Sequence, residues 1–224
     1  MDRKNAAVNP RRPYDSSRRQ RQALETRATI IESSRHLFMR DGYAATTVAA
    51  IALHAGVSVD TVYKSFGGKA GLVRAIFDDG LAGAGPIHAE ARSDHLQATE
   101  PDPRKIIRGW GRLAMEVAPR LAPILLLLRS AAASDRELAA VLEEIDDRRL
   151  QRMTQNARTL MEGGHLRDGV TLAKAADVLW TSSSQELYEL LVIRRGWSVE
   201  AFTQFAGDIM IAALLPSSPR ADST

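Results

Sequence analysis

The sequence contains no cysteine among its 224 residues. Disulfide bonds, thiolate metal sites and cysteine nucleophiles are therefore excluded. A chain without cysteine is compatible with a reducing compartment, and we expect a cytoplasmic protein. Residues 1–21 are polar and rich in arginine, with no apolar stretch leading to a cleavage site, so we expect no secretory signal.

Long apolar runs are also lacking. The longest, LAPILLLL at residues 121–128, is far shorter than the ~20 residues that span a bilayer. It predicts a buried helix and no membrane association. No stretch shows sustained alternation of apolar and polar residues between turn signals, which is the pattern of strands. The sequence therefore predicts an all-α fold.

Few features indicate catalysis or a bound metal. Gly80, Gly83 and Gly85 lack the spacing of a phosphate-binding loop, and Ser182–Ser184 lacks the glycines of a nucleophile elbow. The histidines form no His-x-x-x-His pair and fall in separate predicted segments, at His36, His54, His88, His95 and His165. We expect no metal, no cofactor and no enzymatic activity.

Positive charge is concentrated in the first third of the chain. Residues 1–70 hold twelve Lys and Arg against six Asp and Glu, a balance of +6, whereas the whole chain carries +3. Such an asymmetry is expected when the basic part meets a polyanion. A basic tail without a partner is the alternative.

Apolar spacing and breakers divide the chain into four regions. We predict a flexible basic arm at 1–21, a helix-turn-helix domain at 22–68, a second helical domain at 69–215 and a disordered tail at 216–224. In the second domain we expect helices at 69–83, 103–117, 120–133, 135–162, 171–195 and 199–214, with breaks at GAGP, EPDP, Pro119, GGH and RRGWS.

The segment AGVSVDTVYKSFGGK, residues 55–69, lies at the centre of a predicted helix-turn-helix. Short helices at 47–54 and 58–66 are joined by three residues around Gly56, and Thr46 and Ser58 are candidate N-caps. On the second helix Val62 and Phe66 face inward, whereas the opposite face carries polar side chains. A helix of this kind fits the major groove of a DNA duplex.

The outward side chains have chemistry suited to DNA. Thr47 and Thr61 donate to phosphate, and Tyr63 offers a phenolic donor. Lys64 and Lys69 supply positive charge. Val59 suits a thymine methyl group. We predict DNA contacts from Thr47, Ser58, Val59, Asp60, Thr61, Tyr63, Lys64, Ser65 and Lys69.

Two of these residues have alternative roles. Asp60 either accepts a hydrogen bond from cytosine N4 or acts only as an acid in the first helical turn. Tyr63 either reaches DNA or packs, half-buried, between helices.

Residues 26–72 resemble the N-terminal domain of the TetR family of transcriptional regulators. The shared features include Gly42-Tyr43, Thr46-Thr47-Val48, Ala55-Gly56-Val57-Ser58, Tyr63 and Lys69 in this order. Departures are Ser33-Ser34 in place of alanines, Asp60, and Ala70 after the lysine. The resemblance implies a homodimer that binds an operator in double-stranded DNA, with a divergent C-terminal domain that binds a small-molecule effector and dimerises.

Two apolar stripes near the C-terminus fit a dimer interface of four helices. They are formed by Ala176, Leu179, Ser183, Leu187, Leu190, Phe202, Phe205, Ala206, Ile209 and Ala213. The alternative is that both helices only close the core of a single chain.

Large apolar side chains in 103–133 and 150–190 suit the wall of an effector pocket. We name as candidates Trp110, Met115, Leu125, Leu128, Met153, Trp180 and Tyr188. Arg129 and Arg158 are candidates for pairing with an acidic effector, with solvated helix faces as the alternative.

The sequence thus predicts a DNA-binding transcriptional regulator, a repressor released from a palindromic operator by a small, largely apolar ligand. Two other classes remain open at this point: a DNA-binding protein without sequence preference, and a helical cytosolic enzyme whose helix-turn-helix resemblance is incidental.

Overall fold

The computed structural model of the chain describes residues 16–82 and 87–217, and within them it contains helices and no strand. The all-α prediction is confirmed. The helices are α1 (Ser16–Asp41), α2 (Val48–Ala55), α3 (Val59–Phe66), α4 (Lys69–Ala82), α5 (Ala89–Thr99), α6 (Pro103–Ala132), α7 (Arg136–Glu162), α8 (Leu172–Ser182), α9 (Gln185–Tyr188), a short π-helical segment η1 (Glu189–Arg194) and α10 (Val199–Leu214).

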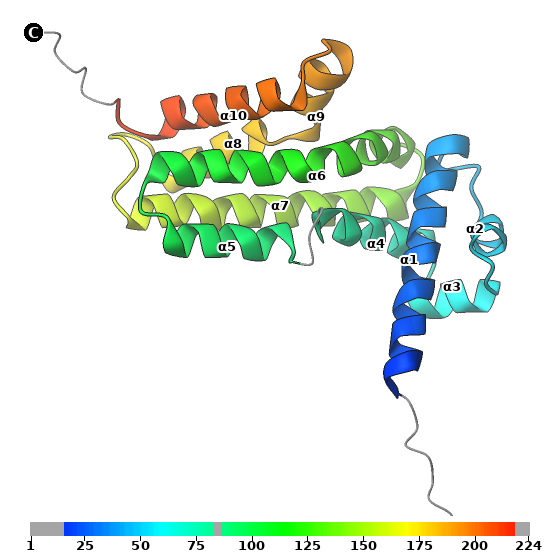
Figure 1. Cartoon of the computed structure of the whole chain (residues 1–224). Coiled ribbons are helices and arrows are strands. Elements are labelled where there is room, and N and C mark those ends of the chain that lie inside the picture. The colour runs from blue at the N-terminus through cyan, green and yellow to red at the C-terminus, as the bar shows by residue number, and fades with distance from the viewer. Residues whose placement is uncertain (1–15, 83–86, 218–224) are drawn as a thin grey trace, which may run out of the picture.

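The helices form a bundle with a small three-helix unit at one end (Figure 1). In the bundle α6 packs between α7 and α10, α8 contacts α7 and α10, and α5 contacts α6. Helix α1 crosses the end of the bundle, and α2 and α3 lie on its far side. Helix α4 contacts α1 and α3 as well as α6 and α7, so it joins the small unit to the bundle.

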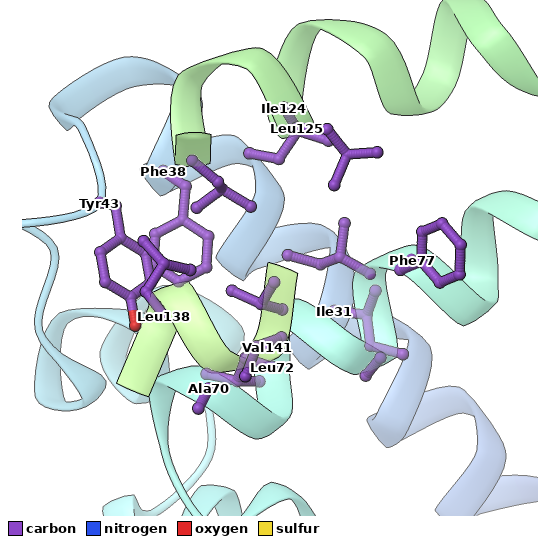
Figure 2. Close-up of a cluster of buried hydrophobic side chains, with 14 of the residues drawn as sticks. Ile31, Phe38, Tyr43, Ala70, Leu72, Phe77, Ile124, Leu125, Leu138 and Val141 are labelled. Carbon is purple, nitrogen blue, oxygen red and sulfur yellow. The ribbon is translucent and has the colours of Figure 1, made fainter. Parts of the chain in front are cut away.

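One hydrophobic core extends from the small unit into the bundle. Figure 2 shows Phe38 and Ile31 of α1 and Leu72 of α4 gathered with Ile124 of α6 and Leu138 of α7. These side chains are all buried, and Phe38, Leu72 and Leu138 have no exposed surface. The division that we predicted between residues 68 and 69 therefore does not separate two cores.

Two further clusters stabilise the rest of the bundle. One joins α6, α7, α8 and α10 through residues such as Ile107, Leu160, Leu179 and Met210. The other is smaller and gathers Met115, Ala122, Tyr188 and Phe202 at the end of α10 near α9. Within the described part of the chain, no helix has the length and apolar character required to cross a membrane.

The predicted flexible arm at 1–21 is wrong for residues 16–21, which form the first turns of α1. Residues 1–15 of the arm, and 218–224 of the predicted tail, lie outside the described residues. Residues 16–21 are polar and bury no apolar surface, so they have no apolar stripe by which a helix could be predicted. They are helical as the continuation of the amphipathic residues that follow them in α1.

The predicted break at Pro119 is also wrong, since α6 continues through both Pro119 and Pro123. A proline inside a helix removes one hydrogen bond and costs about 3 kcal/mol. Around these two positions α6 buries Leu121, Ile124, Leu125 and Leu128. Burial of one such side chain contributes about 1.5–3 kcal/mol, so the core offsets the cost of the prolines.

Helix α5 was not expected, and the segment expected as one helix at 171–195 is divided. Helix α5 buries only Ser93, so it has no apolar periodicity. Besides the partly buried Ala89 and Leu96, polar contacts attach it: the Gln97 amide donates to Asn156 Oδ1 (3.1 Å), and Arg92 forms two hydrogen bonds with Glu116. The other segment divides where Ser184 caps α9 by accepting a hydrogen bond from the Leu187 amide.

Candidate nucleic-acid interface

The turn between α2 and α3 is built from local sequence signals. Thr47 caps α2 by accepting from the Ala50 amide, and Ser58 caps α3 by accepting from the Thr61 amide. Gly56 has φ +68°, a conformation in which glycine carries no steric cost. Its amide bonds the last carbonyls of α2 and ends that helix.

Thr46, which we expected to cap α2, has a different role. Its side chain is buried, and its hydroxyl donates to the carbonyl of Gly42 at 2.8 Å. It therefore closes the turn after α1, and the cap moves by one residue to Thr47.

The inner side of α3 is fixed to α1 and α4. Val62 is completely buried in the shared core, and the guanidinium of Arg27 on α1 lies 4.6 Å from the centre of the Phe66 ring. The carbonyl of Phe66 lies so close to Gly71 of α4 that a Cβ there would be 1.6 Å from the oxygen. These contacts set the orientation of α3 against the rest of the molecule.

The outer side of α3 is exposed. Tyr63 and Val59, one turn apart on α3, are 52% and 40% exposed. Lys64 and Asp60 are also exposed and form an ion pair of 2.6 Å one turn apart. Asp60 is thus both an acid of the first turn and a partner of Lys64. Ser58 and Ser65 are exposed as well, and Thr61 is partly exposed.

Lys69 behaves differently from the other predicted contacts. Its Nζ donates to the carbonyl of Tyr43 at 2.5 Å and lies 4.0 Å from the centre of the Tyr43 ring. Burial lowers the pKa of the Lys69 ammonium, against a smaller opposing effect of Asp135. Within this chain the charge of Lys69 fixes the start of α4 to the turn after α1. A DNA contact from this residue remains a prediction.

The same turn makes the stability of the protein sensitive to alkaline pH. Burial, together with the carboxylates of Asp135 and Glu137, raises the pKa of the Tyr43 phenol from 10.0 to about 12. The folded state therefore favours the neutral phenol. The stability that this preference contributes is complete below pH 10 and is lost as the pH rises to about 12.

We expect Tyr43→Phe to reduce this loss. The free energy of unfolding in urea, measured for both proteins across this pH range, should fall less steeply in the variant, because phenylalanine carries no proton to lose. Other tyrosines and lysines titrate in both proteins and cancel in the comparison. Parallel curves for the two proteins would contradict the assignment.

A contact between α1 and α2 was not foreseen from the sequence. Ser33 is buried, and its hydroxyl lies 3.0 Å from His54 Nδ1 at the end of α2. His54 in turn stacks on His36, with ring centres 5.3 Å apart. The signal was Ser33 itself, a polar residue on the apolar stripe of α1, which required a partner.

The first turns of α1 also contribute to this end of the molecule. A groove of about 960 Å³ lies between them and α3, lined by Arg18, Arg19 and Arg27 on one side and by Thr61 and Ser65 on the other. The basic charge of this region was visible in the sequence, but we predicted a flexible arm there and not a helix. The helix carries these arginines beside α3.

Of the predicted pocket residues, Trp110 and Met153 line one cavity of the bundle, and the other five are not in its wall. This cavity, of about 150 Å³, lies between α4, α5, α6, α7 and α8, and Gln185 of α9 and Met210 of α10 also line it. Leu125 and Leu128 belong to the shared core, and Met115 and Tyr188 to the small cluster near α9. Trp180 lies outside the lining. Arg129 forms ion pairs with Asp146 and Glu186, and Arg158 bonds Gln155.

The predicted dimer residues separate into two groups. Ala176, Leu179, Phe202 and Ala206 are buried within the chain itself and have no surface left for a partner, so their prediction as interface residues is wrong. Their stripes close the monomer core. Leu190 and Ile209 are 50% and 38% exposed, and Ser183, Leu187, Phe205 and Ala213 are partly exposed. Ile193, which we did not predict, is 52% exposed beside them.

Among the residues that the structure describes, no three His, Asp or Glu side chains gather as a possible metal site. The features that remain are an exposed helix with polar chemistry, arginines beside it and a cavity at the other end of α4.

Comparisons with known proteins agree with this geometry. Residues 30–76 match the model of the family described as bacterial regulatory proteins, tetR family. Over 61 residues, 27% of this chain, the sequence is 46% identical to the transcriptional regulator TtgR of Pseudomonas putida. It is 27% identical over 153 residues, 68% of this chain and 76% of the relative, to the uncharacterized regulator YvkB of Bacillus subtilis.

The likeness of the whole fold extends further than that of the sequence. The solved SmeT–triclosan complex superposes with a TM-score of 0.68 at 19% identity, and the match covers 89% of this chain and 96% of that one. By contrast, the match to TtgR spans only 29% of the length of that relative. Residues 30–76 thus match the N-terminal domain of the tetR family of bacterial regulatory proteins, and the fold of the whole chain is similar to that of the solved SmeT.

Proposed function

We propose that this regulator is a repressor that binds a palindromic operator as a homodimer and is released when a small, largely apolar ligand enters the cavity of the bundle. The observation that carries the proposal is the division of α3 into two faces. Val62 is completely buried, whereas Tyr63, next to it in sequence, is 52% exposed. A helix that is packed on one face and exposed on the other can bind a partner molecule through the exposed face.

DNA has the chemistry to supply that surface. Tyr63, Lys64 and Val59 lie on the part of α3 that would enter a major groove, and they suit base edges. Thr47 at the start of α2 is exposed and suits a phosphate. Arg18 and Arg19 lie across the groove from Thr61, where they would neutralise phosphates of the flanking backbone.

A dimer is needed because one such helix reads only a few base pairs. Two recognition helices enter successive major grooves when they lie about 34–36 Å apart, one turn of the duplex. The exposed apolar side chains Leu190, Ile193 and Ile209 lie on η1 and α10, at one edge of the bundle. A symmetric contact through this edge would remove them from water and pair the two chains.

Helix α4 supplies the connection between ligand and DNA. Its first turn packs against α3, and its last turns place Phe77 and Leu81 in the wall of the cavity. Phe77 also belongs to the core shared with α1. A ligand that prefers one position of α4 shifts the spacing of the recognition helices through its different affinity for the two states. SmeT, which has this fold, has been solved with triclosan.

The test is selection from a library of random duplexes with the full chain, followed by titration of the recovered duplex. We expect a palindrome with half-site centres about 10 base pairs apart, or a multiple, bound as one dimer. Affinity for a scrambled duplex should be lower by a factor of about 1,000 or more. Recovery of no preferred sequence, with a steep dependence on salt, would favour binding without sequence preference. Absence of any binding would leave the enzyme alternative.

A further inference from the structure

We infer that the cavity between α4, α5, α6, α7 and α8 binds a small apolar carboxylate, and that Arg149 pairs with its charge. This inference rests on the proposed function, and it names the chemical class of the effector. It follows from three features of the cavity: its size, one arginine without an acidic partner, and buried polar atoms in the wall that have no hydrogen bond.

The size and the wall determine the apolar part of the ligand. The cavity measures about 150 Å³, and most of its wall is apolar, with Phe77, Leu113, Val117, Leu121, Leu179 and Met210 among the lining residues. A cavity of this volume lined by such side chains holds a molecule the size of benzene. The apolar body of the ligand is therefore a single ring or a short branched chain.

Arg149 supplies the charge. Its Nη1 donates to the carbonyls of Trp180 and Ser183, both at 3.1 Å, and its guanidinium lies 4.6 Å from the Trp180 ring. These carbonyls lie at the C-terminal end of α8, where no further helical turn follows to donate hydrogen bonds to them. Arg149 Nε is buried and has no hydrogen-bond partner. Five N–H donors in a plane leave Arg149 able to bind a carboxylate through the donors that the backbone does not use.

The neighbouring arginines have acidic partners, which distinguishes Arg149 from them. Arg148 pairs with Asp78 at 3.0 Å, and Arg152 with Asp94 at 2.7 Å, although both line the cavity. Between residues 16–82 and 87–217, no carboxylate lies within ion-pair distance of Arg149. Asp146 and Glu186 attract it from farther away, but both pair with Arg129.

A buried cation without a carboxylate is costly to the protein. Burial lowers the pKa of the Arg149 guanidinium, and the distant acids only partly oppose this effect. Removing charges from water costs several kcal/mol per ion unless a partner of opposite sign compensates. A bound carboxylate would provide that compensation, so the site favours an anion over a neutral molecule of the same shape.

Two further wall residues offer positions for polar atoms of the ligand. The indole Nε1 of Trp110 is a donor, and Oε1 of Gln185 is an acceptor; both are buried without a hydrogen bond. The two residues are only 6% and 8% exposed. Buried polar atoms normally have partners. Both residues line the cavity, so a polar ligand bound there would offer these atoms a hydrogen-bond partner.

The experiment compares benzoate with benzamide, a neutral molecule of nearly the same shape, by calorimetric titration of the full chain without DNA. We expect benzoate to bind about tenfold or more tightly than benzamide, because a charge-assisted pair replaces neutral hydrogen bonds. In Arg149→Met this ratio should fall to about one. The matched control is Arg152→Met, which also alters the wall but removes an arginine that already has an acidic partner, and it should keep the preference for benzoate.

Equal affinity for benzoate and benzamide in the wild-type protein, or no binding of benzoate, would overturn the inference. So would a preference that persists in Arg149→Met. If that variant does not fold, the ratio in the wild-type protein decides alone. Binding without release of DNA would contradict the ligand response in the proposed function and leave this site intact. Release of DNA by benzamide and benzoate alike would support the ligand response in the proposed function and contradict the preference of this site for a carboxylate.

Discussion

Replacing Tyr63 and Lys64 together with alanine is expected to weaken operator binding by about 100-fold or more while the dimer stays folded. Both side chains lie on the outer face of α3 and leave the core through Val62 untouched. Each side chain that contacts a base contributes about 1–3 kcal/mol, and a dimer loses the contacts twice. The measurement is the dissociation constant for the selected duplex by fluorescence anisotropy.

The stability of this double variant should change little. Tyr63 is 52% exposed, and the ion pair between Lys64 and Asp60 joins two side chains that are 76% and 71% exposed. Exposed pairs of this kind contribute about 0–1 kcal/mol, so the melting temperature should stay close to that of the wild type. Leu150→Ala, another exposed residue but on α7, is the control and should bind DNA normally. Affinity within about threefold of wild type for the double variant would show that α3 is not the recognition helix.

Replacing Gly71 with alanine is expected to destabilise the N-terminal unit by about 3 kcal/mol or more. Gly71 is the third residue of α4, and an alanine Cβ there would lie 1.6 Å from the carbonyl oxygen of Phe66. The clash is with backbone, so no side-chain rotation relieves it. Either α3 separates from α4 or the turn at Gly67 and Gly68 changes, and both movements displace the outer face of α3.

Chemical denaturation and operator binding measure the two consequences of this change. We expect a lower midpoint in urea and a large loss of affinity for the duplex. Gly111→Ala is the matched control, since Gly111 lies in α6 and its nearest neighbour, the Thr203 carbonyl, would be 3.6 Å from the new Cβ. That substitution should stabilise the helix by up to about 1 kcal/mol. Equal stability of the Gly71 variant and the wild type would mean that α3 and α4 are farther apart than described.

The candidate DNA-binding surface could be predicted from sequence because its signals are local. Ser58, Gly56 and the spacing of Val62 and Phe66 lie within eleven residues of one another, and each acts on its own turn of helix. Even the error at Thr46 was an error of one residue, since adjacent threonines offer the same hydroxyl. The inner and outer faces of α3 followed from the period of the helix alone.

The bundle was harder to predict because its decisive contacts join residues distant in sequence. Helix α5 has no apolar stripe, and its attachment depends on pairs such as Gln97 with Asn156, which are 59 positions apart. The continuation of α6 through Pro119 depends on burial against α4 and α7, which the sequence of α6 does not contain. The stripes on α8 and α10 were recognised correctly as apolar, but a stripe does not say whether its partner is the same chain or a second copy.

The sequence by itself determined the helical class, the helix-turn-helix and the polar outer face of α3, because hydrophobic period, caps and turn glycines act over a few residues. Only the tertiary structure decided which arginine of the cavity wall lacks an acidic partner. The sequence alone does not distinguish Arg129 from Arg149. In the structure, Arg129 forms ion pairs with Asp146 and Glu186, whereas Arg149 is hydrogen-bonded to carbonyls at the end of α8, beside a cavity. Charge compensation depends on distance in space, and that distance exists only after the helices have packed.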